Sequence, residues 1–221
     1  FHSRFAMGDR LAIEDEVLAR FGKQSGPDER RGRILIATQV VEQSLDLDFD
    51  VLISDLAPID LMIQRSGRLR RHRRSADGRV LDVGDDQREG SPTLTILAPL
   101  WTDSPGPDWY SSLFPAAQFV YPDTYKLWLT QRALQQACAI ITPGAEGVAG
   151  SVRQLVEAVY GSLSEDVPPG LQRSQNKSLG AESGQRAQAN FNAVDWAKGF
   201  MRAETAHWDD RGLVPTRLGE L

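Results

Sequence analysis

Two short apolar runs in the first quarter of the chain constrain the fold more than any other feature of the sequence. Ile34-Leu35-Ile36-Ala37 and Val51-Leu52-Ile53 are rich in β-branched residues and contain no polar ones. Such runs are typical of parallel strands that are buried on both faces. The segment between them is too long for a hairpin, which favours a crossover connection. The sequence therefore predicts an α/β fold with both runs in a parallel sheet.

Polar residues follow each of these predicted strands directly. Thr38 and Gln39 come after the first run, and Asp55 ends the second. In open α/β sheets, ligands bind at the carboxyl ends of the strands. We therefore expect these polar groups to lie on a functional edge of the sheet.

A helix is predicted after Pro58, over residues 59–71. Proline suits the first turn of a helix, because its missing N–H would have no partner there. Gln64, Arg68 and Arg71 are spaced i, i+4 and i+7, so a helix would place all three on one face. The sequence therefore predicts a basic helix face close to the polar edge of the sheet.

Six arginines lie between positions 65 and 74, in a chain whose net charge is −5. Arginine suits phosphoryl transfer because its planar fork stays charged and can engage two phosphate oxygens. Gly67 is a poor helix former, and glycine allows a close approach of backbone or phosphate. The alternative is a solvated basic helix end, which the helix dipole favours. Spacing alone leaves both interpretations open.

These segments resemble the motifs of a known family. Residues 38–46 (TQVVEQSLD) resemble motif V of superfamily 2 helicases, and residues 64–72 (QRSGRLRRH) resemble their motif VI. With the flanking LDFD and LAPIDLMI, they most resemble the CRISPR-associated helicase-nuclease of type I systems. Residues 1–5 with Asp9 and Arg10 resemble its motif IV region. Ser44 stands where many superfamily 2 helicases have glycine, a departure that agrees with the CRISPR branch.

The resemblance implies a set of nucleotide-binding residues. Arg68 and Arg71 match the catalytic motif VI arginines that reach the γ-phosphate of ATP. Arg65 matches the arginine that pairs with acidic residues of the other motor lobe, and Gln64 the residue that couples nucleotide state to the lobe interface. Asp46 matches the acid near the ribose.

A second set of residues is expected to bind DNA. Thr38 matches a motif V position that touches the DNA backbone, and Gln39 follows it. His2 and Arg4 are candidates for a phosphate contact, although a plain surface role suits a His near a terminus equally well.

The resemblance also implies a domain organisation. Residues 1–98 would be part of the second RecA-like helicase lobe, a partial parallel sheet with flanking helices. Residues 99–122 would be a linker, and residues 123–221 a small, mainly helical C-terminal accessory domain. For this last part the resemblance rests on position more than on motifs.

Periodicity and breaker residues predict the remaining elements. The aromatic residues Trp101, Trp109, Tyr110 and Phe114 in the proline-rich segment 98–122 are expected to pack onto a neighbour, with stacking on DNA bases as the alternative. Helices are expected over 10–21, over 124–141 with Asp123 or Thr124 as cap, over 151–160 and over 185–207. A strand is expected over 93–97, with a polar loop at 22–32, a mobile loop at 73–92 and a further loop at 167–184.

Cysteine usage and hydropathy bound the environment of the chain. Cys138 is the one cysteine and lies in an apolar helical stripe, so we expect a buried thiol and no disulfide within the chain. This fits a reducing, cytoplasmic location. No apolar run approaches the length of a membrane span, so no membrane partner is expected.

Several motifs are absent from the sequence. It has no G-x-x-x-x-G-K-[ST] loop and no DExD/H acid cluster. His2, His72 and His207 are far apart, so no metal site is predicted. ATP and Mg²⁺ would therefore be bound mainly by a first helicase lobe outside this chain, and the divalent metal of the nuclease by a domain also outside it. The isolated chain is expected to be inactive.

These observations lead to a functional expectation. The resemblance implies part of an ATP-dependent single-stranded DNA translocase, coupled to a nuclease that degrades invading DNA in type I CRISPR immunity. The implied partners are single-stranded DNA, the RNA-guided CRISPR surveillance complex, and the N-terminal nuclease and first helicase lobe. The alternatives are a noncatalytic DNA- or protein-binding module, or a different superfamily 2 helicase such as a DEAD-box RNA remodeller. The QSLDLDFD run and Gln64 argue against the last of these.

Overall fold

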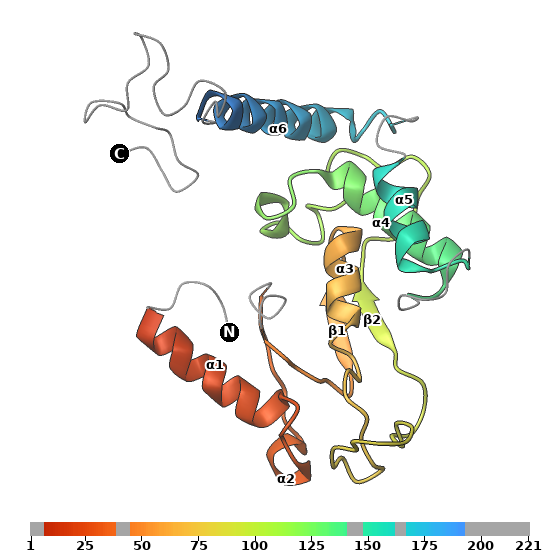
Figure 1. The fold of residues 1–221 in the computed structure, drawn as a ribbon. Helices are drawn as coiled ribbons and strands as arrows, with labels where there is room; N and C mark the ends of the chain where they lie inside the picture. The colour runs from red at the N-terminus through yellow and green to blue at the C-terminus, as the bar shows by residue number, and fades with distance from the viewer. Residues whose placement is uncertain (1–6, 39–44, 141–147, 162–166, 193–221) are drawn as a thin grey trace, which may run out of the picture.

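The computed structural model describes residues 7–38, 45–140, 148–161 and 167–192. The elements are α1 (Met7–Phe21), α2 (Pro27–Arg30), β1 (Leu52–Asp55), α3 (Ile59–Ser66), β2 (Leu94–Leu97), the 3-10 turn η2 (Ala117–Phe119), α4 (Thr124–Ala137), α5 (Val152–Tyr160) and α6 (Gln172–Asn192). Figure 1 shows an elongated arrangement, with α1 and α2 at one end, the small sheet and α3 in the middle, and α4, α5 and α6 at the other end. His2, Arg4, Gln39, His207 and Arg217 lie outside the described residues.

The sheet consists of β1 and β2, which are parallel. Both were predicted as strands, but the sequence did not predict that they pair with each other. They pair from Leu52 opposite Leu94 to Asp55 opposite Leu97. Leu94 and Ile96 pack against the main hydrophobic core, which includes two buried residues of α3. On the other face, Ile53 is 65% exposed and Leu97 51%. The prediction that the strands are buried on both faces is therefore wrong for the described part of the chain.

The other predicted strand, Ile34 to Ala37, does not form. This run has no strand in the structure, and the side chains of Ile34 and Ile36 are 87% and 84% exposed. A strand needs a neighbouring strand to complete its ladder, and this run lies beside none in the part of the chain that the structure describes. The apolar character of the run was therefore not enough to predict its state.

Helix α1 packs through one face, as its amphipathic pattern predicts. Val17 and Phe21 are buried and form a small cluster with Leu45 and Leu47. The polar loop predicted for residues 22–32 is interrupted by α2. Pro27 occupies its first turn and the Glu29 carboxylate accepts a hydrogen bond of 2.9 Å from the Gly26 N–H, so this short helix is capped.

Helix α3 is shorter than predicted. It ends at Ser66 with Gly67 as C-cap, so the prediction of a helix reaching Arg71 is wrong, and Gln64, Arg68 and Arg71 do not share a helix face. The reason is a competing backbone pairing. The Phe49 N–H donates to the Arg68 carbonyl, and the Arg70 N–H donates to the Phe49 carbonyl, each at 2.8 Å. The segment after Gly67 therefore runs beside Phe49 instead of continuing the helix.

One hydrophobic core joins α3 to α4 and α5, and it includes aromatic residues of the predicted linker. Trp101 stacks on Trp128 with ring centroids 5.0 Å apart. The Tyr110 hydroxyl is buried and donates a hydrogen bond of 2.8 Å to the Leu56 carbonyl. The expectation that these aromatics pack onto a neighbour is confirmed. The domain limits themselves stay a prediction.

Helix α4 begins where a cap was predicted, because the Asp123 carboxylate accepts a hydrogen bond of 3.2 Å from the Lys126 N–H. It ends before Cys138, whose φ of 55° takes the chain out of the helix. The thiol of Cys138 is exposed, so the prediction of a buried cysteine is wrong. The apolar stripe stops one residue before it.

The last two helices differ in how well the sequence predicts them. Helix α5 begins after its predicted cap, Ser151, whose hydroxyl accepts from the Gln154 N–H at 3.4 Å. Helix α6 occupies most of the segment predicted as a loop over residues 167–184. Polar contacts with α4 hold it there: the Lys126 ammonium lies 3.0 Å from Glu182 and the Thr124 hydroxyl lies 2.6 Å from that of Ser174. Figure 1 shows α6 lying across the end of the molecule beyond α4 and α5.

Among the described helices, none is both long and apolar enough to cross a membrane.

Candidate nucleotide and nucleic-acid interface

The two segments that resemble helicase motifs meet at Asp46. Its carboxylate oxygen Oδ1 lies 2.7 Å from Arg71 Nε and 2.9 Å from His72 Nε2. Asp46 lies just before β1, and the other two residues follow α3. The backbone of Phe49, three residues after Asp46, pairs with that of Leu69, two residues before Arg71. This pairing brings the two segments side by side. The structure therefore places Asp46 and Arg71 in one partly exposed cluster.

The charges in this cluster influence one another. Burial opposes ionisation of Asp46, but the hydrogen bond from His72 and the positive charge of Arg71 outweigh it and lower the pKa of this carboxyl. For Arg68, burial is the main cause that lowers the pKa, and the neighbouring positive charge of Arg71 adds to it. Asp46 opposes that shift. Arg68 therefore lies in the same electrostatic environment as Arg71.

A buried ion pair lies behind the cluster. Arg74 and Asp48 are both fully buried, and Arg74 Nε donates a hydrogen bond of 2.5 Å to Asp48 Oδ2. Asp48 Oδ1 also accepts from the His72 N–H at 3.3 Å. Buried charges are tolerated when they are paired and fully hydrogen-bonded. Here the pair fixes the backbone of His72, next to Arg71.

Further charged side chains extend this network. Arg88 Nη1 lies 2.8 Å from Asp50 Oδ1, and Arg88 Nε lies 2.9 Å from Asp86 Oδ1. Arg30 Nη2 lies 3.0 Å from Asp50 Oδ2 and donates to the Asp48 carbonyl at 2.7 Å. The ends of the 73–92 segment are thus held by buried or half-buried arginines. The prediction of a mobile loop is wrong for these ends.

This network was not predicted from the sequence. Its members are Arg30, Asp48, Asp50, Arg74, Asp86 and Arg88. Arginines in a polar segment are usually solvated, so they gave no sign of burial. The alternation of apolar residues with Asp over residues 45–50 indicates one buried, apolar face, which would leave Asp48 exposed, so it did not predict the burial of Asp48 either.

Arg65 and Gln64 lie on α3, away from the contact between Asp46 and Arg71. Arg65 donates to the Ser54 hydroxyl at 2.7 Å, to the Asp55 carbonyl at 3.1 Å and to the Tyr121 hydroxyl at 2.9 Å. It therefore ties the end of β1 to the segment before α4. Gln64 is exposed on α3, and Thr38 is exposed after the run that follows α2.

The structure describes no metal centre. Among the residues with described positions, no group of three or more His, Cys, Asp and Glu side chains is arranged to hold a metal ion. What the site offers is positive charge: Arg68 and Arg71 beside Asp46. This chemistry suits the phosphates of a nucleotide and not a cation.

Comparison with known proteins identifies the family. Residues 1–74 match the family described as CRISPR-associated nuclease/helicase Cas3, C-terminal. The chain is 32% identical to the CRISPR-associated endonuclease/helicase Cas3 of Escherichia coli (strain K12), over 100% of this chain and 22% of that protein. It is 37% identical to the Thermus thermophilus protein of the same name, over 96% of this chain and 20% of that protein. The chain belongs to the Cas3 family.

Solved Cas3 structures share the fold. The crystal structure of T. fusca Cas3 matches with a TM-score of 0.62 and 35% identity, over 88% of this chain and 20% of that chain. A chain of a CRISPR RNA-guided surveillance complex in a pre-nicking state matches with a TM-score of 0.56 and 33% identity, over 88% of this chain and 21% of that chain. The described α/β fold is thus that of the C-terminal part of Cas3. The chain spans about a fifth of the length of the relatives it matches.

Proposed function

We propose that this chain supplies the arginine side of an ATP site in a longer Cas3 protein. The observation that supports this proposal is the contact of Asp46 with Arg71 and His72, at 2.7 and 2.9 Å. It joins the segment resembling motif V to the segment resembling motif VI. Residues that act together on one ligand need such a connection, because a small displacement of a positioned group is costly.

In this proposal Arg68 and Arg71 contact the phosphates of ATP. Arg71 is 43% exposed although it pairs with Asp46, so a phosphate can reach it. Asp46 orients the Arg71 guanidinium and lies near the ribose. Gln64 and Arg65 act at the interface with the first helicase lobe, and the hydrogen bonds of Arg65 to Ser54 and Tyr121 fix its position.

ATP would arrive with Mg²⁺ bound mainly by the first lobe. When bound, ATP would supply the free energy of phosphoryl transfer. The residues of this chain would complete the site with positive charge, as arginines do in related nucleotide hydrolases. The divalent metal of the nuclease would be held by a domain outside this chain. We therefore propose that the chain alone neither hydrolyses ATP nor cleaves DNA.

The function of the whole protein follows as a proposal. It is an ATP-dependent translocase on single-stranded DNA, coupled to a nuclease that degrades invading DNA in type I CRISPR immunity. The names of the relatives, endonuclease/helicase, support the pairing of activities. The structural match within a surveillance complex supports that complex as a partner. Thr38, with Gln39, His2 and Arg4, is proposed to contact the DNA backbone in a cytoplasmic enzyme.

A second candidate function is a noncatalytic binding module. The absence of a phosphate-binding loop from the sequence is compatible with it. In that case the basic residues after α3 would be a surface for DNA or protein, and ATP would not be their ligand.

ATP hydrolysis stimulated by single-stranded DNA tests the proposal. It would be measured for the chain alone, for a full-length Cas3 protein that carries this chain as its C-terminal part, and for the Arg68→Ala and Arg71→Ala variants of that full-length form. An arginine at the γ-phosphate is worth about 10³-fold or more in rate, so each variant should lose about that factor. Arg79→Ala is the control, because Arg79 is 77% exposed and pairs only with Asp77 among the described carboxylates. Full activity of the Arg68→Ala and Arg71→Ala variants would favour the binding module.

A further inference from the structure

A shallow cavity beside Arg71 is the feature from which a further site follows. Its volume is ≈ 210 Å³, and its wall includes Lys23, Arg71, His72 and Arg73. Pockets that enclose a whole organic ligand are larger than this and mostly apolar. This cavity is small, and its lining combines the cations Lys23, Arg71 and Arg73 with the single carboxylate Asp82. Its size and chemistry fit a single phosphate group.

Two of these cations have no anionic partner in the part of the chain that the structure describes. Arg71 pairs with Asp46, and Arg74 with Asp48. Lys23 and Arg73 are exposed and have no carboxylate within ion-pair distance among the described residues. The lining carries more cationic than anionic side chains, because Asp82 is the one carboxylate in it, and an excess of charge of one sign in a hollow attracts ions of the opposite sign. The cavity therefore presents positive charge to an arriving anion.

The cavity is built on a fixed frame. Buried Arg74 donates from Nη2 to the Lys23 carbonyl at 3.3 Å, which holds the backbone after α1. On the opposite side, the Leu81 N–H donates to the Arg73 carbonyl at 2.9 Å, and Arg74 pairs with Val80 in an antiparallel bridge. Successive side chains of an extended segment point to opposite sides. Arg74 is fully buried, whereas Arg73 lines the cavity.

We propose that Lys23 and Arg73, with His72 beside them, bind a phosphate group in this cavity. The group is either a phosphodiester of single-stranded DNA or the phosphate chain of a nucleotide. Neither Lys23 nor Arg73 belongs to the segments that resemble helicase motifs. The site also does not require Arg68 or Arg71 to contact ATP, so it stands or fails independently of the function proposed above.

Binding measurements on the 221-residue chain test the site. Fluorescence anisotropy would follow a fluorescein-labelled oligothymidine and, separately, a fluorescent ATP analogue, with wild type and Lys23→Ala/Arg73→Ala. We expect about tenfold weaker binding of at least one probe. For the oligothymidine, the slope of log K against log salt should become shallower by about 1.4, since each contact to a single-strand phosphate contributes about 0.7. Loss with the oligothymidine alone assigns DNA, and loss with the ATP analogue alone assigns a nucleotide.

Two further variants make the test specific. Arg31→Ala/Arg79→Ala removes the same charge from exposed positions outside the cavity and should leave both affinities unchanged. Asp82→Asn removes a carboxylate from the wall of the cavity and should strengthen binding, because it removes repulsion while keeping both cations. Circular dichroism would verify that each variant is folded. Equal losses in the two double variants, or no binding of either probe by the folded wild type, would overturn the proposal.

Discussion

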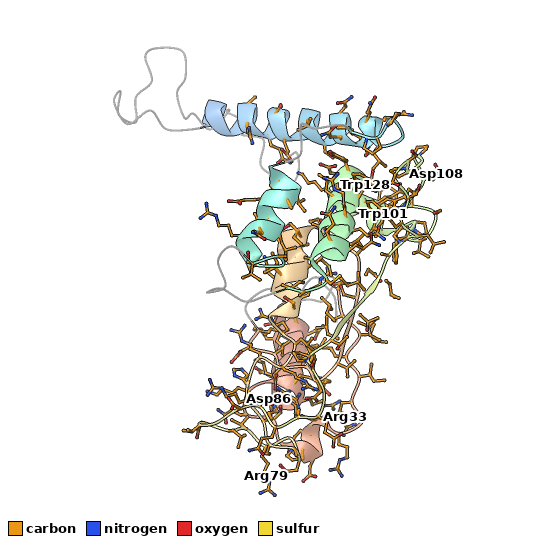
Figure 2. All side chains as sticks on the ribbon, turned by 90° about the vertical axis from the view of Figure 1, so that its right-hand side faces the viewer. Arg33, Arg79, Asp86, Trp101, Asp108 and Trp128 are labelled. Atoms are coloured by element: carbon orange, nitrogen blue, oxygen red, sulfur yellow. The ribbon has the colours of Figure 1, made fainter. Side chains whose placement is uncertain are left out.

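The two ends of the molecule are stabilised by different interactions. The ionic region, comprising α1, α2 and residues 45–50 and 68–90, contains the buried pair Arg74–Asp48 and only a small apolar cluster. The aromatic region, comprising α3, residues 98–137 and α5, contains the main hydrophobic core. Figure 2 shows Arg33, Arg79 and Asp86 at one end and Trp101 and Trp128 at the other.

This contrast places the candidate functional residues. Asp46, Arg71 and the cavity at Lys23 and Arg73 all belong to the ionic region. Charged side chains held by a buried ionic network keep fixed directions while their outer neighbours still face solvent. The aromatic region instead provides a packed body on which α3 rests. Each prediction below tests whether the two regions respond differently.

The largest effect is expected for Arg74→Met. Removing one partner of a buried ion pair leaves Asp48 charged without its closest partner and typically costs about 3–5 kcal/mol. Urea denaturation would measure the free energy of unfolding, and peptide-level hydrogen exchange would locate the loss in the ionic region. Arg79→Met is the matched control, since that side chain is 77% exposed. Equal loss of protection in α4 and α5 would show that the two regions unfold as one unit.

A similar or slightly smaller effect is expected in the aromatic region for Leu127→Ala. Leu127 is fully buried in the core, and truncation of a buried leucine costs about 2–5 kcal/mol. The same two measurements apply, but here the loss of protection should begin in α4. Leu113→Ala serves as the control, because Leu113 is 52% exposed. If exchange accelerated first in α1, the division into two regions would be wrong.

A smaller effect is expected for Tyr110→Phe. The variant keeps the buried ring but removes the hydroxyl that donates to the Leu56 carbonyl. An acceptor left without its donor in a buried position costs about 1–3 kcal/mol. Tyr160→Phe removes a hydroxyl that donates to Asp60 at a more exposed position, so it should cost less. Urea unfolding of the two variants checks this, because Tyr110→Phe should have the lower unfolding midpoint. A lower midpoint for Tyr160→Phe would contradict the role given to Tyr110.

The smallest and most gradual effect is expected from acid. Burial opposes ionisation of Asp50, but hydrogen bonds and charges from Arg88 and Arg30 outweigh it and lower the pKa of this carboxyl. Burial also opposes ionisation of Asp86, but the hydrogen bond from Arg88, the Arg74 N–H and the charges of Arg88 and Arg70 lower its pKa. A carboxyl whose pKa is lower in the folded state than in the unfolded state stabilises the fold at pH values above its unfolded-state pKa of about 3.9. That stabilisation is lost as the pH falls through the folded pKa.

The ionic region should therefore lose hydrogen-exchange protection below about pH 4, before the aromatic region does. Hydrogen exchange at a series of pH values, corrected for the intrinsic rate, would measure the order. Asp50→Asn should reduce the pH dependence, since it removes one of the titrating groups. Simultaneous loss in both regions would mean that these carboxylates do not control acid unfolding of the ionic region.

The sequence was most informative where local signals and packing agree. The caps Asp123 and Ser151 and the periodicity of α1, α4 and α5 predicted those helices, and the apolar runs at β1 and β2 predicted both strands, although not their pairing with each other. The part of α6 up to residue 184 was predicted as a loop, because its Gly and Ser residues suggested one and its contacts with α4 were not visible, whereas residues 185–192 were predicted as the start of a helix. Local propensity is a weak prior that such tertiary contacts override.

The sequence predicted which residues belong to the candidate site better than it predicted how they are arranged. Motif resemblance selected Asp46 and Arg71 as nucleotide-site residues, and the structure brings these two together. It gave no information about Asp48 and Arg74, since a sequence does not reveal which charged residues are paired and buried. The predicted end of α3 was wrong for a related reason. The pairing of Phe49 with Leu69 is a long-range backbone contact, and the pattern of residues within the helix does not reveal it.

The exposed thiol of Cys138 has a practical consequence. It is the one cysteine of the chain, and it follows the last turn of α4 in the aromatic region. A maleimide dye or a nitroxide would therefore attach to this chain at a single known position, and no other cysteine would have to be replaced in it. Paired with a label on a DNA strand, such a probe would report by energy transfer how far the aromatic region lies from the strand.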